Sequence, residues 1–124
     1  MKILLSIKPE FANKIFEGSK KFEFRRSIFK NSAVKSVVVY ASAPVSKVIG
    51  EFEIELVHKK ELNQLWNDTK DYSGITREYY DLYFTGKEEG FAIQVKNPRL
   101  YKKAQNLKEE YGMVPPQSFA YMQS

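Results

Sequence analysis

The sequence of 124 residues contains no cysteine and only one histidine, His58. Without cysteine the chain can form no disulfide bond, no thiolate metal site and no cysteine nucleophile. A single histidine excludes metal sites built from several imidazoles, and a Ser-His-Asp triad would have to use His58 itself. We therefore expect neither a metal ion nor a cofactor.

Long apolar segments are also missing. No stretch reaches the roughly 18 apolar residues that cross a bilayer. The first eight residues, MKILLSIK, hold an apolar run too short for a signal peptide and no small-residue cleavage site. We expect a cytoplasmic protein without a membrane partner. The length predicts a single domain over residues 1–124, large enough to bury one hydrophobic core.

Basic residues are concentrated at the start of the chain. Residues 1–36 hold nine basic and three acidic residues, whereas residues 37–124 hold eleven basic and twelve acidic ones. The overall charge of +5 therefore comes entirely from the first third of the chain. A basic surface attracts polyanions such as nucleic acids. The alternative is a soluble basic protein whose lysines are only solvated.

Hydrophobic periodicity predicts an α+β fold. Strands are expected at 2–7, 22–25, 34–40, 48–57, 90–95 and 119–122, and helices at 9–17, 62–66, 75–84 and 104–111. In the strand at 48–57 the apolar face includes Ile54 and Leu56, and the strand at 90–95 should end near Asn97-Pro98. Since helices do not separate the strands regularly, a small, mostly antiparallel β-barrel of about six strands with flanking helices is the natural packing.

The densest polar segment is Gly18-Ser19-Lys20-Lys21-Phe22-Glu23-Phe24-Arg25. Gly18 is suited to end the preceding helix in a left-handed conformation. Glu23 and Arg25, two residues apart on a strand, point to the same side, and Lys20 stands at the entrance of that strand. A carboxylate between cations suits a ligand that carries phosphate and hydrogen-bond donors. The alternative is a row of paired charges on an exposed strand, which would contribute little to the stability of the fold and would have no ligand.

The segment also resembles a known family. Its glycine, lysine, glutamate and arginine fit the G-x-K-x-x-E-x-R pattern of ASCH domains, which belong to the PUA-like superfamily. The flanking segments VVYASAP at 38–44, VIGEF at 48–52, FAI at 91–93 and PPQSFAY at 115–121 are also similar to ASCH proteins. The resemblance covers essentially the whole chain. It implies a six-stranded PUA-like barrel with a cleft between the barrel and the helices.

The resemblance implies a role in binding RNA or a nucleotide. By the motif, Lys20, Glu23 and Arg25 would line the cleft, with Arg26 beside them. Segment similarity adds three residues at its rim, which are Ser42, Gln117 and Ser118.

Other functions also remain open. One branch of the family removes the acetyl group from acetylcytidine with a lysine and a threonine three positions later. Here Lys20 matches the lysine but Glu23 replaces the threonine, so a hydrolase would have to use Glu23 as the base for water and Lys20 for the oxyanion. Nuclease activity has also been raised for ASCH proteins, although no cluster of metal-binding carboxylates is evident. The third alternative is a regulatory adaptor that binds another protein.

Aromatic residues are frequent between 72 and 84 (Tyr72, Tyr79, Tyr80, Tyr83 and Phe84). They could stack with the bases of single-stranded RNA. Their helical spacing more simply predicts packing against the sheet.

Overall fold

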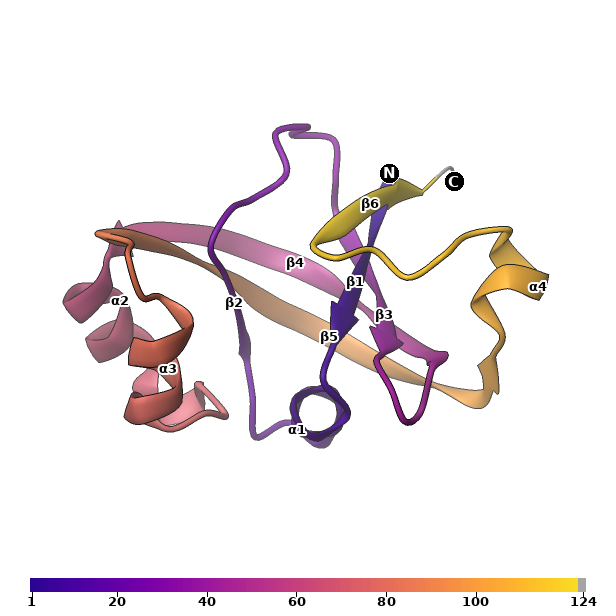
Figure 1. The fold of residues 1–124 in the computed structure, drawn as a ribbon, viewed down its shortest axis with the longest axis horizontal. Helices are drawn as coiled ribbons and strands as arrows, with labels where there is room; N and C mark the ends of the chain where they lie inside the picture. Colours follow the sequence, from indigo (N-terminus) through magenta and orange to yellow (C-terminus); the bar gives the residue numbers. More distant parts are fainter. Residues whose placement is uncertain (123–124) are drawn as a thin grey trace.

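The computed structural model describes residues 1–122. The elements in chain order are β1 (Lys2–Ile7), α1 (Pro9–Glu17), β2 (Phe22–Arg25), β3 (Ser36–Ala41), β4 (Lys47–Glu61), α2 (Leu62–Thr69), η1 (Lys70–Tyr72), α3 (Arg77–Tyr83), β5 (Glu89–Gln105), α4 (Leu107–Tyr111) and β6 (Phe119–Met122). All predicted strands and helices are present, and the α+β class is confirmed (Figure 1).

The six strands form one sheet in the order β2-β5-β4-β3-β1-β6. Only β1 and β3 run parallel, and the other neighbours pair antiparallel. Within the described part of the chain the sheet does not close, so the expectation of a barrel is corrected on this point. The two edge strands, β2 and β6, have four residues each and pair only with β5 and β1.

The two long strands differ from their predicted lengths. β4 and β5 cross the whole molecule, with α2 and α3 at one end and α4 at the other (Figure 1). β5 does not end at Asn97-Pro98, because a register shift opposite Glu51–Glu53 accommodates Pro98 as a bulge. A second shift, at Ile54/Leu56, turns Leu56 toward solvent, where it is 55% exposed, and Val57 packs on the core instead.

The core has three parts. The largest lies between the sheet and α1 and includes Ile3, Leu5 and Ile15. A second joins α4 to β1 and β3. The third packs Phe24 and Ala92 of the sheet on Leu65 of α2 and on Tyr80 and Phe84. Packing therefore explains Tyr80 and Phe84, as the helical spacing predicted, and Tyr83 packs against the same cluster. Tyr79 instead contacts Phe11 of α1.

Candidate nucleotide pocket

The motif begins where α1 ends. Gly18 has φ 94° and its N–H donates to the carbonyls of Lys14 and Ile15. This left-handed cap turns the chain back, and the N–H of Lys20 then donates to Lys14 O at 3.1 Å. Because β2 starts two residues later, the turn fixes Lys20 between α1 and the sheet, as the spacing predicted.

Lys20 is almost completely buried, with 2% of its surface exposed. Its Nζ donates to Ser73 O at 2.6 Å and lies 5.0 Å from the ring centre of Phe24 and 5.5 Å from that of Phe11. Desolvation by burial lowers the Lys20 pKa to about 8, although the charge of Glu23 opposes the shift and that of Lys14 adds to it. An ammonium with such a pKa exchanges its proton near neutral pH, which suits acid–base work.

The loop after η1 holds Lys20 in place. Gly74 has φ 68°, and a Cβ atom there would lie 2.6 Å from Cβ of Lys20. Only glycine allows this loop to approach so closely. Lys14 Nζ donates to Gly74 O at 3.1 Å, and Ser73 Oγ donates to Ile75 O at 3.0 Å. The loop is therefore tied to α1 and presents the Ser73 carbonyl to Lys20.

Glu23 and Arg25 complete the polar side of the site. Glu23 is 7% exposed, and its Oε2 receives a long hydrogen bond of 3.4 Å from Arg25 Nη1. Arg25 Nη2 donates to the carbonyl of Ser118 at 2.9 Å and lies 3.3 Å from its hydroxyl. Arg25 thus joins edge strand β2 to the residue that precedes β6, across the opening of the sheet.

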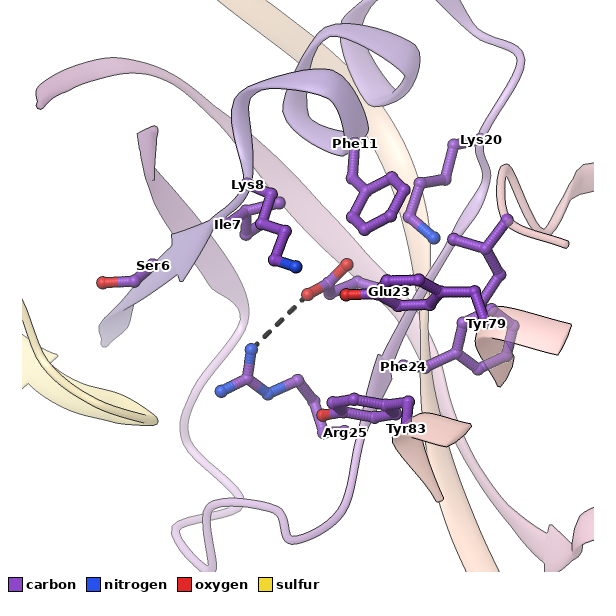
Figure 2. Close-up of a pocket in the computed structure, with 11 residues that line it drawn as sticks. Ser6, Ile7, Lys8, Phe11, Lys20, Glu23, Phe24, Arg25, Tyr79 and Tyr83 are labelled. Carbon is purple, nitrogen blue, oxygen red and sulfur yellow. Dashed lines mark hydrogen bonds and ion pairs between the residues drawn. The ribbon is translucent and has the colours of Figure 1, made fainter. Parts of the chain in front are cut away.

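These side chains surround a pocket of about 160 Å³. Its residues are Ser6, Ile7, Lys8, Phe11, Lys20, Glu23, Phe24, Arg25, Ile75, Tyr79 and Tyr83, contributed by β1, α1, β2 and α3 with the residues beside them (Figure 2). The lining combines aromatic rings with charged side chains, and the amines of Lys8 and Lys20 lie over rings of the pocket. Burial raises the Tyr83 pKa, and Arg25 only partly opposes it, so this phenol remains a hydrogen-bond donor.

The predicted site residues divide into two groups. Lys20, Glu23 and Arg25 converge on the pocket, whereas Ser118 is not part of its lining and contacts it only through the hydrogen bond from Arg25. Arg26 points elsewhere and donates to the carbonyls of Tyr83 and Thr85, both at 2.8 Å.

Two more candidates also lie outside the pocket lining. Ser42 is in the turn after β3, where its N–H donates to Ile7 O. Gln117 is an exposed residue of the segment before β6.

Sequence reasoning did not identify Ser6 or Lys8 as part of this site. Lys8 is exposed, and its Nζ lies 5.2 Å from the ring centre of Tyr79. Figure 2 shows its amine directed toward the Glu23 carboxylate. Ser6 Oγ donates to Pro116 O at 2.9 Å. Both residues lie at the end of β1, directly before the helix that leads into the motif. That position in the sequence could have indicated that they belong to the site.

Two further observations concern residues 1–122. No group of three or more His, Asp or Glu side chains is placed to share a metal ion. None of the helices is long and apolar enough to cross a bilayer.

Comparison with known proteins identifies the class. The ASCH domain family model matches residues 5–115. An ASCH domain-containing ribonuclease of Zymomonas mobilis is 30% identical over 96% of this chain and 82% of its own length. The crystal structure of ASCH from Zymomonas mobilis covers 98% of this chain and 87% of that chain, with 30% identity and a TM-score of 0.90. The chain belongs to the ASCH domain family.

Two other similarities are more limited. The large ribosomal subunit protein uL22 of Ureaplasma parvum is 30% identical over 97% of this chain, which spans 39% of the length of that relative. The N-terminal domain of Staphylothermus marinus McrB has a TM-score of 0.54 at 13% identity, covering 91% of this chain and 80% of that one. That likeness shows the fold alone.

Proposed function

We propose that this protein binds single-stranded RNA and that the pocket receives one nucleotide of the strand. The observation that carries the proposal is the convergence of Lys20, Glu23 and Arg25 on one pocket that is also lined by aromatic rings. A nucleotide has a flat ring, hydrogen-bonding edges and a phosphate. The pocket offers aromatic rings to the first, a carboxylate to the second and cations to the third.

The size of the pocket fits a single base. A cavity of roughly 150 Å³ accepts a benzene ring, and this pocket measures about 160 Å³. Phe11 and Tyr79 meet edge to face, with their ring centres 5.1 Å apart. Bases stack on such rings, at about 1–3 kcal/mol for each base. A base of an unpaired strand therefore enters more readily than one inside a duplex.

The charges suit the other parts of the nucleotide. Glu23 offers carboxylate oxygens to an N–H on the edge of the base, in the way carboxylates read cytosine. Lys8, which is exposed, and Arg25, which contacts Glu23, also line the pocket and can neutralise a phosphate. The buried Lys20 adds a further positive charge. The named ribonuclease from Zymomonas mobilis supports RNA as the nucleic acid.

Binding can be tested by fluorescence anisotropy with a labelled RNA of three nucleotides at 50 and 200 mM salt. We expect affinity to fall with salt, because phosphate contacts release counterions, and the Lys20→Met/Arg25→Gln double variant, which removes two contacts, to bind at least about 1000-fold more weakly. The matched control is Lys59→Gln/Lys87→Gln, which removes two exposed charges, one near the end of β4 that leads into α2 and one in the loop after α3. Equal affinity in the double variant and wild type would exclude the pocket as the RNA site.

Cleavage of the bound RNA is a second candidate, favoured by the lowered Lys20 pKa beside Glu23. In this reaction Glu23 takes the proton of a ribose 2′-hydroxyl, whose oxygen attacks the adjacent phosphorus. The bond from phosphorus to the 5′-oxygen breaks, and the Lys20 ammonium returns a proton to that oxygen. The products are a 2′,3′-cyclic phosphate and a 5′-hydroxyl.

Cleavage is tested by identifying the RNA ends and by comparing variants. Glu23→Gln and Lys20→Met should each lower the rate at least about 100-fold, while the Lys59→Gln/Lys87→Gln control keeps it. Cleavage that persists in both pocket variants would show a contaminating nuclease. Turnover of acetylcytidine that depends on Lys20 and Glu23 would favour the amidohydrolase alternative instead. An RNA-independent protein partner in a pulldown would favour the adaptor.

A further inference from the structure

We propose that a second, basic surface at the far end of β5 binds the phosphate backbone of the same RNA outside the pocket. This inference rests on the proposed function and extends it from one nucleotide to a longer strand. The surface is a broad hollow of about 690 Å³ between the end of β5 and α4. We call it the β5 groove, and its residues are Arg99, Leu100, Tyr101, Lys102, Lys103, Gln105 and Tyr111.

The sequence around the β5 groove is strongly biased in charge. Residues 90–108 contain five basic residues (Lys96, Arg99, Lys102, Lys103 and Lys108) and no acidic residue. The net charge of residues 37–124 conceals this bias, because the glutamates that balance it lie on β4 and elsewhere. Acidic residues return only at Glu109 and Glu110, on α4.

The ion pairs show which cations are available. Arg99 is held by Glu51 at 2.8 Å and Lys96 by Glu55 at 3.6 Å. Lys102 and Lys103 are exposed, and neither forms an ion pair within residues 1–122. Two exposed lysines in a hollow provide neutralising charge for phosphates without giving up a bond in the fold.

The floor of the β5 groove is shaped for a flexible strand rather than for a particular base. The hydroxyl of Tyr101 donates to Glu51 and that of Tyr111 donates to Gln105, so both phenols are already occupied. Leu100 is 59% exposed and offers apolar surface between the charges. Such a surface contacts backbone and ring faces and does not read sequence.

The segment from α4 to β6 connects the groove to the pocket. Tyr111 lines the β5 groove and Ser118 receives the hydrogen bond from Arg25. Figure 1 shows this yellow segment running from α4 toward β1. Seven residues span at most about 25 Å, so Tyr111 of the groove and Ser118, which contacts Arg25 of the pocket, lie within that distance of one another. At roughly 3.4 Å for each nucleotide of a stacked strand, about eight nucleotides suffice to reach both.

RNA length separates the two sites. We would measure the salt dependence of binding for a trinucleotide and a 12-mer on wild type, on Lys102→Gln/Lys103→Gln and on the Lys59→Gln/Lys87→Gln control. For the 12-mer we expect the groove variant to lower the salt slope by about 1.4 and the affinity roughly tenfold. The trinucleotide should bind all three proteins equally, and the control should match wild type with both RNAs.

The possible results distinguish this inference from the proposed function. If wild type binds both RNAs with the same slope, or if the groove variant binds the 12-mer normally, the β5 groove is not an RNA surface and the pocket proposal stands. An equal loss in the control would show a general effect of net charge and would also overturn the inference. Binding of poly-glutamate with the same dependence on Lys102 and Lys103 would overturn RNA as its specific ligand. Failure of wild type to bind either RNA would overturn both proposals.

Discussion

Two partly buried glutamates, Glu23 and Glu51, illustrate the difference between a site and a structural contact. Glu51 accepts from Lys2 Nζ at 3.0 Å and from the Tyr101 hydroxyl at 2.9 Å, and Arg99 Nη2 lies 2.8 Å away. Glu23 has one hydrogen bond in the described structure, of 3.4 Å, from Arg25. Their side chains are similarly shielded, at 15% and 9% exposure.

The difference lies in what remains available to a ligand. Burial raises the Glu51 pKa, but the hydrogen bonds from Lys2 and Tyr101 and the charges of Lys2 and Arg99 outweigh this effect, so the pKa falls below its ordinary value. Because its oxygens are occupied by three short contacts, Glu51 holds β4 to β1 and β5 and has little capacity left to bind a ligand. Glu23 keeps acceptor capacity and faces an open pocket.

Arg25→Gln should give the largest effect on the Glu23 side of this comparison. It removes the cation that contacts both Glu23 and Ser118, and we expect RNA affinity to fall roughly 100-fold. Arg26→Gln is the matched control, since Arg26 is the adjacent arginine and does not line the pocket. Fluorescence anisotropy with the labelled trinucleotide measures the RNA affinity of both variants. Equal losses in the two variants would contradict the assignment of Arg25.

Glu51→Gln should affect stability and not binding. We expect the free energy of unfolding at pH 7 to fall by about 2 kcal/mol, because three contacts to a charged group are weakened. The folded-state pKa is lowered, so this contribution is complete above the ordinary carboxyl pKa of 4.5 and is lost as the pH falls below it. Urea unfolding at pH 7 and pH 3 measures the difference. If the free energy of unfolding at pH 7 does not change, Glu51 does not have the structural role assigned to it.

Gly74→Ala tests how the loop positions Lys20. The added Cβ would lie 2.6 Å from Cβ of Lys20, at a residue with φ 68°. We expect about 1–2 kcal/mol of destabilisation and a shift in the pH at which RNA affinity declines, since Lys20 loses its position against the Ser73 carbonyl. The control is Gly86→Ala, which has a similar φ of 85° but open space around it. A pH profile identical to wild type would show that the loop has only a structural role.

The pH dependence of binding should be the smallest effect. With a pKa of about 8, Lys20 loses its proton as the pH rises through the range in which free lysine remains charged. We expect trinucleotide affinity to fall about fourfold between pH 7 and 8.5. Stability should change in the opposite direction and increase between pH 8 and 10.5, because there the unfolded chain binds more protons than the folded one. A binding profile that is flat over this range would exclude charged Lys20 from the interaction.

Much of this organisation could be predicted from sequence. Alternation and capping signals located all six strands and the four α-helices of the described residues, though not η1, and the spacing of Glu23 and Arg25 placed both on one side of β2. Leu56 was assigned to the wrong face because a bulge interrupts the alternation and leaves no mark in the hydrophobic pattern. The open sheet was missed because strand lengths and register, which decide closure, are not encoded in periodicity.

The pocket could be predicted only in part. The motif identified three polar residues, but Lys8 and Tyr79 come from segments that reach the site through the folding of α1 and α3. The hydrogen bond from Lys20 to the Ser73 carbonyl joins residues 53 positions apart. It uses a backbone atom, so no side-chain pattern could indicate it.

The most direct test of the central claim compares two lysines. Lys20 lies beside Glu23 in the pocket, and Lys2 is paired with Glu51 at 3.0 Å. Lys20→Met and Lys2→Met remove the same charge, and trinucleotide affinity and urea unfolding would be measured for both. We expect Lys20→Met to lose roughly 100-fold in affinity while its stability does not fall, since burying the ammonium costs about 3 kcal/mol at a pKa lowered from 10.5 to about 8. Lys2→Met should bind RNA as wild type does and lose about 1 kcal/mol of stability. Normal RNA binding by Lys20→Met would contradict the account.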